Sequence, residues 1–327
     1  MRKESMIGVL SRNTKLGNEQ DYQIRRVLSR SELSVVYIVR HIETGTMSVI
    51  KEFFPSALAR RCSDGKTIKC LKASVSPQFV KLREAFQREA MVLRDLQHPG
   101  IVRYEGYFET NGTAYLVMEY CHGITLDSVV RKNQLRINAD FLRTSMLPLI
   151  GALEHIHQQG YVHRDIKPAN ILIGKDGKSK LIDFGSVIRY TDSATEHPIF
   201  TTAGYSPLEL YSDKSLQTPV ADIYSLAATL YFCCIGAAPI AVPTRLFEDK
   251  LVSVRAGNRA VSPFLSRIIH WGLALSANKR CSSLRWFRAA LQTEYILHKK
   301  SVVRLTGRKP AVVPHSLPKE REFQHSD

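Results

Sequence analysis

Hydrophobic and polar residues alternate in short runs along the first third of the chain. The runs YQIRRVL (22–28), VVYIVRHI (35–42), MSVIKEFF (47–54) and TAYLVMEYC (113–121) are rich in β-branched and aromatic residues. Turn sequences such as ETGT (43–46) and TNGT (110–113) break this alternation. A two-residue period bounded by such turns predicts β-strands.

A helical period interrupts these strands and later replaces them. From Pro77 to Leu96 apolar residues recur three or four positions apart, and HPG (98–100) ends the pattern. After residue 122 the segments 141–160, 219–236, 262–276 and 283–295 show the same period, which predicts helices. A short strand pair is expected at 171–184, with Asp176 and Gly177 in its turn.

This order of elements predicts an α+β protein of two lobes with a crevice between them. We expect an N-terminal lead at 1–20, a small β-rich N-lobe with one main helix at 21–121, and a larger, mainly helical C-lobe at 122–297. The last segment, 298–327, is basic and interrupted by prolines, which is typical of a flexible tail.

Composition adds a strong positive charge and few other constraints. The 327 residues have a net charge of +16 and are 44% hydrophobic, with no apolar run long enough to span a bilayer. The N-terminus lacks a signal-peptide pattern, and the six cysteines lack disulfide or metal spacing, so we expect a cytoplasmic protein with reduced thiols. The basic residues are spread out, with a local excess at 60–83, which favours a solvated basic surface over nucleic-acid binding.

Two loops combine residues suited to phosphoryl transfer. VHRDIKPANILI (162–173) holds Asp165, which can accept a proton from a hydroxyl, and Lys167, which can neutralise a phosphoryl group. Asn170 in the same stretch can bind a divalent cation, as can Asp183 in LIDFGS (181–186). A carboxylate on each side of one strand pair is hard to explain as turn structure alone.

At these motifs the chain resembles the protein kinase family. HRDIKPAN, DFG, the VIK around Lys51, Glu89, GYSPLEL and ADIYSLA occur in family order over residues 21–293. IKEFFPSALARR (50–61) is most similar to a group of bacterial eukaryotic-like (Hanks-type) serine/threonine kinases with IKEFFP after the strand lysine. The resemblance implies a bilobal protein-kinase fold, transfer of the ATP γ-phosphate to protein substrates, and Mg²⁺, with Mn²⁺ as an alternative.

The resemblance also implies a role for each matching residue. Asp165 would orient or deprotonate the substrate hydroxyl, Lys167 would lie beside the γ-phosphate, and Lys51, paired with Glu89, would hold the other phosphates. Asn170 and Asp183 would bind the metal. The nucleotide would contact Ser29, Ser31, Ser34, Val36, Val49, Lys51, Met118, Glu119, Cys121 and Leu172.

The activation segment suggests the type of acceptor. Lys167 together with Thr202 matches the serine/threonine pattern, and Arg164 before Asp165 is typical of kinases that are ordered by phosphorylation of this segment. Candidate autophosphorylation sites are Thr191, Ser193, Thr195 and Thr201. A buried ion pair is expected between Glu209 and Arg280.

The phosphate-binding turn departs from the family. Where kinases have three glycines, LSRSELS (28–34) has Ser29, Ser31 and Ser34, and each adds a Cβ and a hydroxyl. A seryl hydroxyl could itself bind phosphate. The alternative is a pseudokinase or nucleotide-binding scaffold, and a kinase-fold small-molecule phosphotransferase is a third hypothesis. Regulation would come from a protein partner, the tail or the activation segment.

Overall fold

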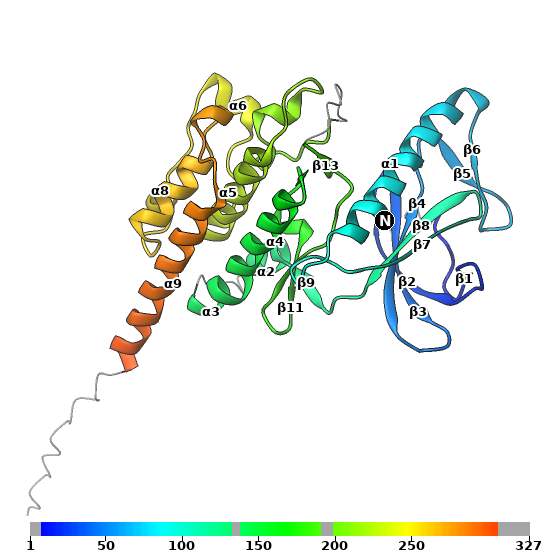
Figure 1. The fold of residues 1–327 in the computed structure, drawn as a ribbon, viewed down its shortest axis with the longest axis horizontal. Helices are drawn as coiled ribbons and strands as arrows, with labels where there is room; N and C mark the ends of the chain where they lie inside the picture. Colours follow the sequence, from blue (N-terminus) through cyan, green and yellow to red (C-terminus); the bar gives the residue numbers. More distant parts are fainter. Residues whose placement is uncertain (1–7, 133–137, 191–198, 307–327) are drawn as a thin grey trace, which may run out of the picture.

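The computed structural model describes residues 8–132, 138–190 and 199–306. Two lobes form, a β-rich one from the first part of the chain and a helical one from the rest (Figure 1). This is the bilobal α+β arrangement predicted from the sequence.

The N-lobe is built on one antiparallel sheet of six strands in the order β1-β2-β3-β4-β8-β7. Its strands are β1 (Lys15–Leu16), β2 (Tyr22–Arg30), β3 (Ser34–His41), β4 (Met47–Phe53), β7 (Tyr104–Thr110) and β8 (Thr113–Glu119). Short turns join β3 to β4 and β7 to β8, whereas β4 and β8 pair although α1 and other elements lie between them in the sequence. Two irregularities in β2, at Arg25 and Leu28, shift its register against β3.

The helix α1 (Ser76–Asp95) packs on one face of this sheet. Its apolar stripe buries Phe79 and Phe86 against Phe53 of β4, with ring centroids 5.2 and 5.7 Å apart. These contacts fix the turn of α1 that holds Glu89 beside the β4 strand that holds Lys51.

The opposite face is covered by residues 8–16 and by a hairpin of β5 (Ala59–Arg61) and β6 (Ile68–Cys70). Beneath them the Glu52 carboxylate, fully buried, accepts hydrogen bonds from Tyr37, Tyr115 and both terminal nitrogens of Arg61. The Leu10 amide donates to the Tyr37 hydroxyl at 3.0 Å. Residues 8–20 of the predicted N-terminal lead therefore pack as part of the small lobe. The basic segment 60–83 is bound to the same lobe through Arg61.

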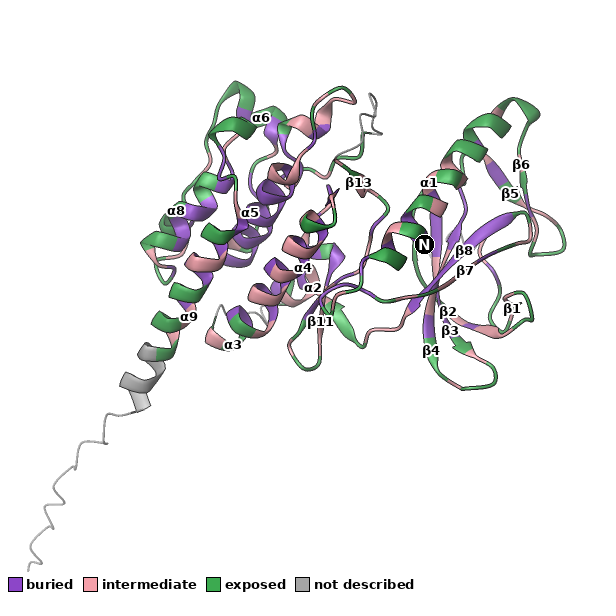
Figure 2. Ribbon diagram, in the orientation of Figure 1, coloured by how far each residue is buried: buried purple, intermediate pink, exposed green. Residues whose placement is uncertain are grey.

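The C-lobe surrounds one buried helix. Its helices are α2 (Leu126–Arg131), α3 (Ala139–Phe141), the π-helical η3 (Leu142–Met146), α4 (Leu147–Gln158), α5 (Pro219–Ile235), α6 (Val242–Phe247), α7 (Val254–Gly257), α8 (Pro263–Gly272) and α9 (Leu284–Thr306). The sequence of α5 is apolar on all sides, and the helix is buried along nearly its whole length (Figure 2). Gly236 ends it in the left-handed conformation, with φ of 85°.

Short strands and single-turn helices lie at the junction with the N-lobe or connect the larger helices. The strands are β9 (Gly123–Thr125), β10 (Tyr161–Val162), β11 (Ile171–Gly174), β12 (Ser179–Leu181) and β13 (Ile188–Arg189). The turns of 3₁₀ helix are η2 (Ala73–Val75), η4 (Pro168–Asn170), η5 (Leu208–Tyr211) and η6 (Ala277–Lys279).

The sequence predicts one buried ion pair and one domain boundary in the C-lobe. The Arg280 guanidinium, fully buried, contacts Glu209 at 2.7 Å, which confirms that ion pair. The boundary expected at residue 297 falls inside α9, which continues to Thr306, and the rest of the predicted tail lies outside the described residues. Within the described ranges, no helix has the length and apolar character needed to cross a membrane.

Candidate active site

Lys51 on β4 joins the two lobes through two carboxylates. Its Nζ lies 2.7 Å from Glu89 Oε1 of α1 and 3.0 Å from Asp183 Oδ1, which follows β12. Burial disfavours the charged amine, but the two anions outweigh it and raise the pKa of Lys51. Burial raises the pKa of Glu89, and Lys51 opposes that shift. The ammonium is therefore fixed at the junction of the lobes.

Asp183 is held in place by its neighbours along the chain. Its Oδ1 accepts a hydrogen bond from the Gly185 amide at 3.2 Å, and its side chain is 44% exposed. The Lys51 charge lowers the pKa of Asp183 to about 2, against the opposing effect of burial. Phe184 is buried and its ring lies 5.0 Å from that of His163, so the segment is anchored next to the partly exposed carboxylate.

Asp165 lies at the centre of a second polar network. Lys167 Nζ contacts Asp165 Oδ2 at 2.8 Å and donates to Thr202 Oγ1 at 3.1 Å, and Thr202 Oγ1 donates to Asp165 Oδ1 at 3.2 Å. Asn170 Nδ2 donates to the Asp165 carbonyl and to Oδ2, at 2.9 and 2.8 Å. Thr202 thus ties the activation segment to both charged residues of the loop.

The backbone of this loop is strained and is held by a buried carboxylate. Arg164 has φ of 67°, a left-handed conformation that costs a non-glycine residue about 1–3 kcal/mol. Asp222 of α5 accepts hydrogen bonds from the amides of His163 and Arg164, each at 2.8 Å, and lies 2.8 Å from His157 Nε2. Asp222 therefore positions Asp165 without touching it.

The Arg164 side chain is directed inward. Its guanidinium donates to the Ser186 carbonyl at 2.6 Å and to Gln217 Oε1 at 2.7 Å, and burial lowers its pKa to about 10. Both hydrogen-bond acceptors are neutral, and the nearby carboxylates of Asp222 and Asp165 offset only part of the effect of burial. Of the predicted phosphoacceptors, Thr201 is exposed, whereas Thr191, Ser193 and Thr195 lie outside the described residues.

Strand register places several of the expected nucleotide contacts on one face of the N-lobe sheet. Val36 lies opposite Lys51, and Val49 lies opposite Met118, so their side chains share the face that holds the Lys51 ammonium. Leu172 comes from β11 of the other lobe and is partly buried. Leu28, directly before Ser29 on β2, is 48% exposed at the second register shift of that strand.

The segment between the lobes is partly occupied by its own contacts. The Glu119 amide donates to the Arg103 carbonyl at 3.0 Å, and the Glu119 carboxylate accepts from the Arg103 amide and pairs with Lys180. Because the Glu119 amide is occupied, its backbone would contact a nucleotide through the carbonyl, which would accept a hydrogen bond from it. Burial raises the pKa of the Cys121 thiol to about 11.

The serine turn uses its hydroxyls to close itself. Ser31 Oγ accepts from the amides of Ser34 and Leu33, at 3.0 and 3.3 Å, and lies 3.0 Å from Ser34 Oγ. The Ser31 amide donates to the Ser34 carbonyl at 2.9 Å. Two amides of the kind that a glycine loop offers to phosphate are therefore occupied by Ser31.

The tip of the same turn is bound to the segment that follows β4. The Phe54 amide donates to the Leu33 carbonyl at 2.8 Å, and the Ser56 amide donates to the Glu32 carbonyl at 3.0 Å. Ser56 Oγ adds a second contact to that carbonyl at 3.3 Å. The FFPS sequence that follows Lys51 and Glu52 thus fastens the turn to the lobe.

The two predicted metal-binding side chains each have an oxygen available for Mg²⁺. Asn170 directs its amide nitrogen at Asp165, which leaves Oδ1 as an available acceptor, and Asp183 gives Lys51 and Gly185 only its Oδ1. In the described part of the chain no group of three His, Cys, Asp or Glu side chains could hold a metal ion. Mg²⁺ needs few protein oxygens, because it keeps waters and takes phosphate oxygens as ligands.

Comparison with known proteins agrees with this geometry. Residues 22–296 match the protein kinase domain family. The chain is 31% identical over 238 residues to the serine/threonine-protein kinase PknA of Nostoc sp., covering 69% of this chain and 42% of that protein. It is 32% identical over 248 residues to the serine/threonine-protein kinase C of Synechocystis sp., covering 72% of this chain and 45% of that one.

A solved structure shares the fold. The apo form of PpkA-294 superimposes with a TM-score of 0.74 at 28% identity, covering 87% of this chain and 99% of that one. The chain spans about half the length of the curated relatives it matches. The kinase-domain match covers most of the chain, and the chain belongs to the protein kinase family.

Proposed function

We propose that this chain is a serine/threonine protein kinase that transfers the γ-phosphate of ATP to protein hydroxyls. The observation that supports it is the completeness of the two polar networks. Lys51 contacts Glu89 and Asp183, and Asp165 contacts Lys167 and Thr202. Transfer of a phosphoryl group requires mainly positioned charges, and these charges are in contact without any rearrangement of the lobes.

Each charged residue of the two networks has a role in the transfer that suits its surroundings. Asp165 accepts the proton of the attacking hydroxyl as the oxygen–phosphorus bond forms, and ADP leaves with the electrons of the broken bond. Lys167, 2.8 Å from Asp165, neutralises charge on the transferring group, and Lys51 holds the remaining phosphates. Val36, Val49, Leu172 and Met118 enclose the adenine.

Asn170 and Asp183 would hold Mg²⁺, or Mn²⁺, through their oxygens, and the bound ion would supply neutralisation of phosphate charge. Ser29 offers the turn's remaining hydroxyl, since Ser31 and Ser34 bond one another.

Control by the activation segment follows from Arg164. Its charge is buried and its hydrogen-bond partners are neutral, so a phosphate on Thr201, or on Thr191, Ser193 or Thr195, would offer it an anion. We place autophosphorylation on this segment. The protein would work in the cytoplasm, where ATP is available and the six cysteines, all unpaired, stay reduced. A regulatory protein partner is part of this proposal.

The test is transfer of label from γ-labelled ATP in Mg²⁺ by the purified chain, alone and with a generic basic protein. We expect phosphoserine or phosphothreonine, and loss of the label in both Asp165→Ala and Asp183→Ala. Label that persists in Asp165→Ala would overturn the assignment of the base.

One observation favours a second function, a nucleotide-binding scaffold: the closed serine turn. Nucleotide binding in a thermal-shift assay, without transfer after activation-segment phosphorylation, would support that alternative and refute the kinase.

A further inference from the structure

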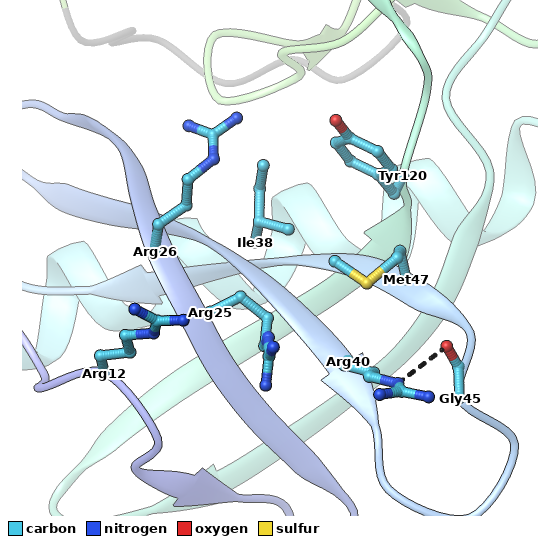
Figure 3. A pocket seen from close by; sticks show the side chains of 8 residues that line it. All are labelled: Arg12, Arg25, Arg26, Ile38, Arg40, Gly45, Met47 and Tyr120. Atoms are coloured by element: carbon cyan, nitrogen blue, oxygen red, sulfur yellow. Dashed lines mark hydrogen bonds between the residues drawn. The ribbon is translucent and has the colours of Figure 1, made fainter.

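A pocket lined by four arginines lies in the N-lobe, outside the residues assigned to transfer. Its cavity is about 720 Å³, and it is lined by Arg12, Arg25, Arg26, Ile38, Arg40, Gly45, Met47 and Tyr120 (Figure 3). The volume falls in the range of small-molecule and side-chain binding sites. None of these lining residues is acidic.

An irregularity in the sheet brings two of the arginines together. Ile24 pairs with Val39 and Arg26 pairs with Ile38, so Arg25 is the extra residue of a β-bulge. In a regular strand neighbouring side chains point to opposite faces, whereas a bulge redirects one of them. Arg25 and Arg26 consequently both line the pocket.

The other two arginines reach it from neighbouring segments. Arg40 stands near the end of β3, and its Nε donates to the Gly45 carbonyl at 3.3 Å, which fixes the guanidinium and leaves its terminal nitrogens for a ligand. Arg12 precedes β1. Within the described residues none of the four forms an ion pair, and the side-chain hydrogen bond of Arg25 goes to Gln23. Four uncompensated charges around one cavity repel one another, and a bound anion would relieve that repulsion.

The pocket is separate from the place of the ATP phosphates. Register puts Arg26, Ile38 and Arg40 on the same sheet face as Val36 and Lys51. Arg40 lies four residues beyond Val36, about 13 Å along the strand and away from Lys51. Tyr120, which lies between Glu119 and Cys121 in the segment joining the lobes, lines the pocket as well. The site is therefore an extension of the crevice at its outer end.

We propose that this arginine pocket binds a phosphorylated serine or threonine side chain of a polypeptide. Guanidinium groups bind phosphate through paired hydrogen bonds, and no lysine lines the pocket. Ile38, Met47 and the Tyr120 ring give an apolar floor for the neighbouring residues of a peptide. A nucleic acid would need a basic track with interleaved aromatics, whereas these charges surround a single cavity with one aromatic residue.

This proposal rests on the proposed function, because a kinase produces such ligands: its own phosphorylated activation segment in a second copy, or a phosphorylated substrate. Both sources present the same phosphomonoester, so peptide sequence distinguishes them. The first probe is a fluorescein-labelled peptide of residues 196–210 with phosphothreonine at 201. The other probes are its unphosphorylated form, a scrambled phosphopeptide and a single-stranded RNA oligomer.

Fluorescence polarisation is measured with a saturating non-hydrolysable ATP analogue, so that the crevice is occupied. The test variant is Arg26→Ala with Arg40→Ala. The matched control is Arg60→Ala with Lys69→Ala, which removes two exposed charges from the β5–β6 hairpin. We expect the phosphopeptide to bind at least about tenfold more tightly than its unphosphorylated form, and the test variant alone to lose that preference.

Tighter binding of the 196–210 phosphopeptide than of the scrambled one identifies a second copy as the source, and equal binding identifies phosphorylated polypeptides in general. Three results overturn the proposal: no preference for phosphate, equal losses in test and control variants, or RNA bound more tightly than phosphopeptide through Arg26 and Arg40. Transfer from labelled ATP to a basic protein is measured on the same samples. Phosphopeptide binding without transfer would refute the kinase function and support the pocket. Transfer without phosphopeptide binding would refute the pocket and support the kinase function.

Discussion

Replacing Ser31 by alanine tests what the serine turn does to ATP binding. The alanine keeps the Cβ and removes the oxygen that accepts from the Ser34 and Leu33 amides. These two neutral bonds and the contact with Ser34 Oγ are partly exposed, so their loss costs about 1–1.5 kcal/mol of stability. For a domain of this size that lowers the melting temperature by about 2–4 °C.

The same change should strengthen ATP binding. Two amides released by Ser31→Ala become available to phosphate, and a charge-assisted bond to each is worth about 1.5 kcal/mol before the ordering cost of the opened turn. A net gain of about 1 kcal/mol corresponds to a KM for ATP about fivefold lower.

The assay is steady-state transfer to a basic protein across a range of ATP concentrations, beside a thermal melt of each variant. Ser29→Ala is the matched control for the thermal melt, because no hydrogen bond of the Ser29 hydroxyl holds the described turn together, and its melting temperature should not change. A KM for ATP that rises about tenfold in Ser31→Ala would refute the reasoning. It would mean that the Ser31 hydroxyl contacts phosphate directly.

Three further changes test other parts of the structure. Glu52→Gln leaves the Arg61 guanidinium without its anion, and we expect a loss of about 3 kcal/mol in urea unfolding. Asp222→Asn should cost about 3 kcal/mol at pH 7. Burial opposes ionisation, but hydrogen bonds from His157 and nearby amides hold the pKa of Asp222 below 3.8. Its stabilisation is full above that value and is lost as the pH falls through the lower folded-state pKa, so the two proteins should converge in acid. Thr202→Val should lower kcat about tenfold with an unchanged KM for ATP, since it removes the hydroxyl that bonds both Asp165 and Lys167 and ties them to the activation segment.

Much of the fold was predictable from local patterns. The segment 77–96 has a helical period and forms α1, and the Asp-Gly turn at 176–177 joins β11 and β12 in a hairpin. Lys51, Glu89 and Asp183 lie far apart in sequence, and the motifs alone indicated that they belong to one site. Their contacts depend on how the two lobes pack, which no local pattern contains.

Other features depend on contacts that a single sequence does not display. Ser31 looked available to phosphate, but its hydroxyl closes its own turn. In the sequence Arg61 is one of several charges in the basic segment 60–83, but its side chain is buried against Glu52. The arginine pocket depends on a bulge at Arg25, and the alternation of β2 gives no sign of the extra residue. In each case a tertiary partner or a register shift decides the role.

The most direct test of the central claim, that the turn is altered and the transfer chemistry retained, restores the glycines. Wild type is compared with a variant carrying Ser29→Gly, Ser31→Gly and Ser34→Gly, measuring kcat and the KM for ATP in Mg²⁺. We predict transfer by both proteins, with kcat values within about threefold of each other and a lower KM in the glycine variant. Transfer by the glycine variant alone, or a kcat about a hundredfold above wild type, would contradict the account, because the serine turn would then block the reaction itself.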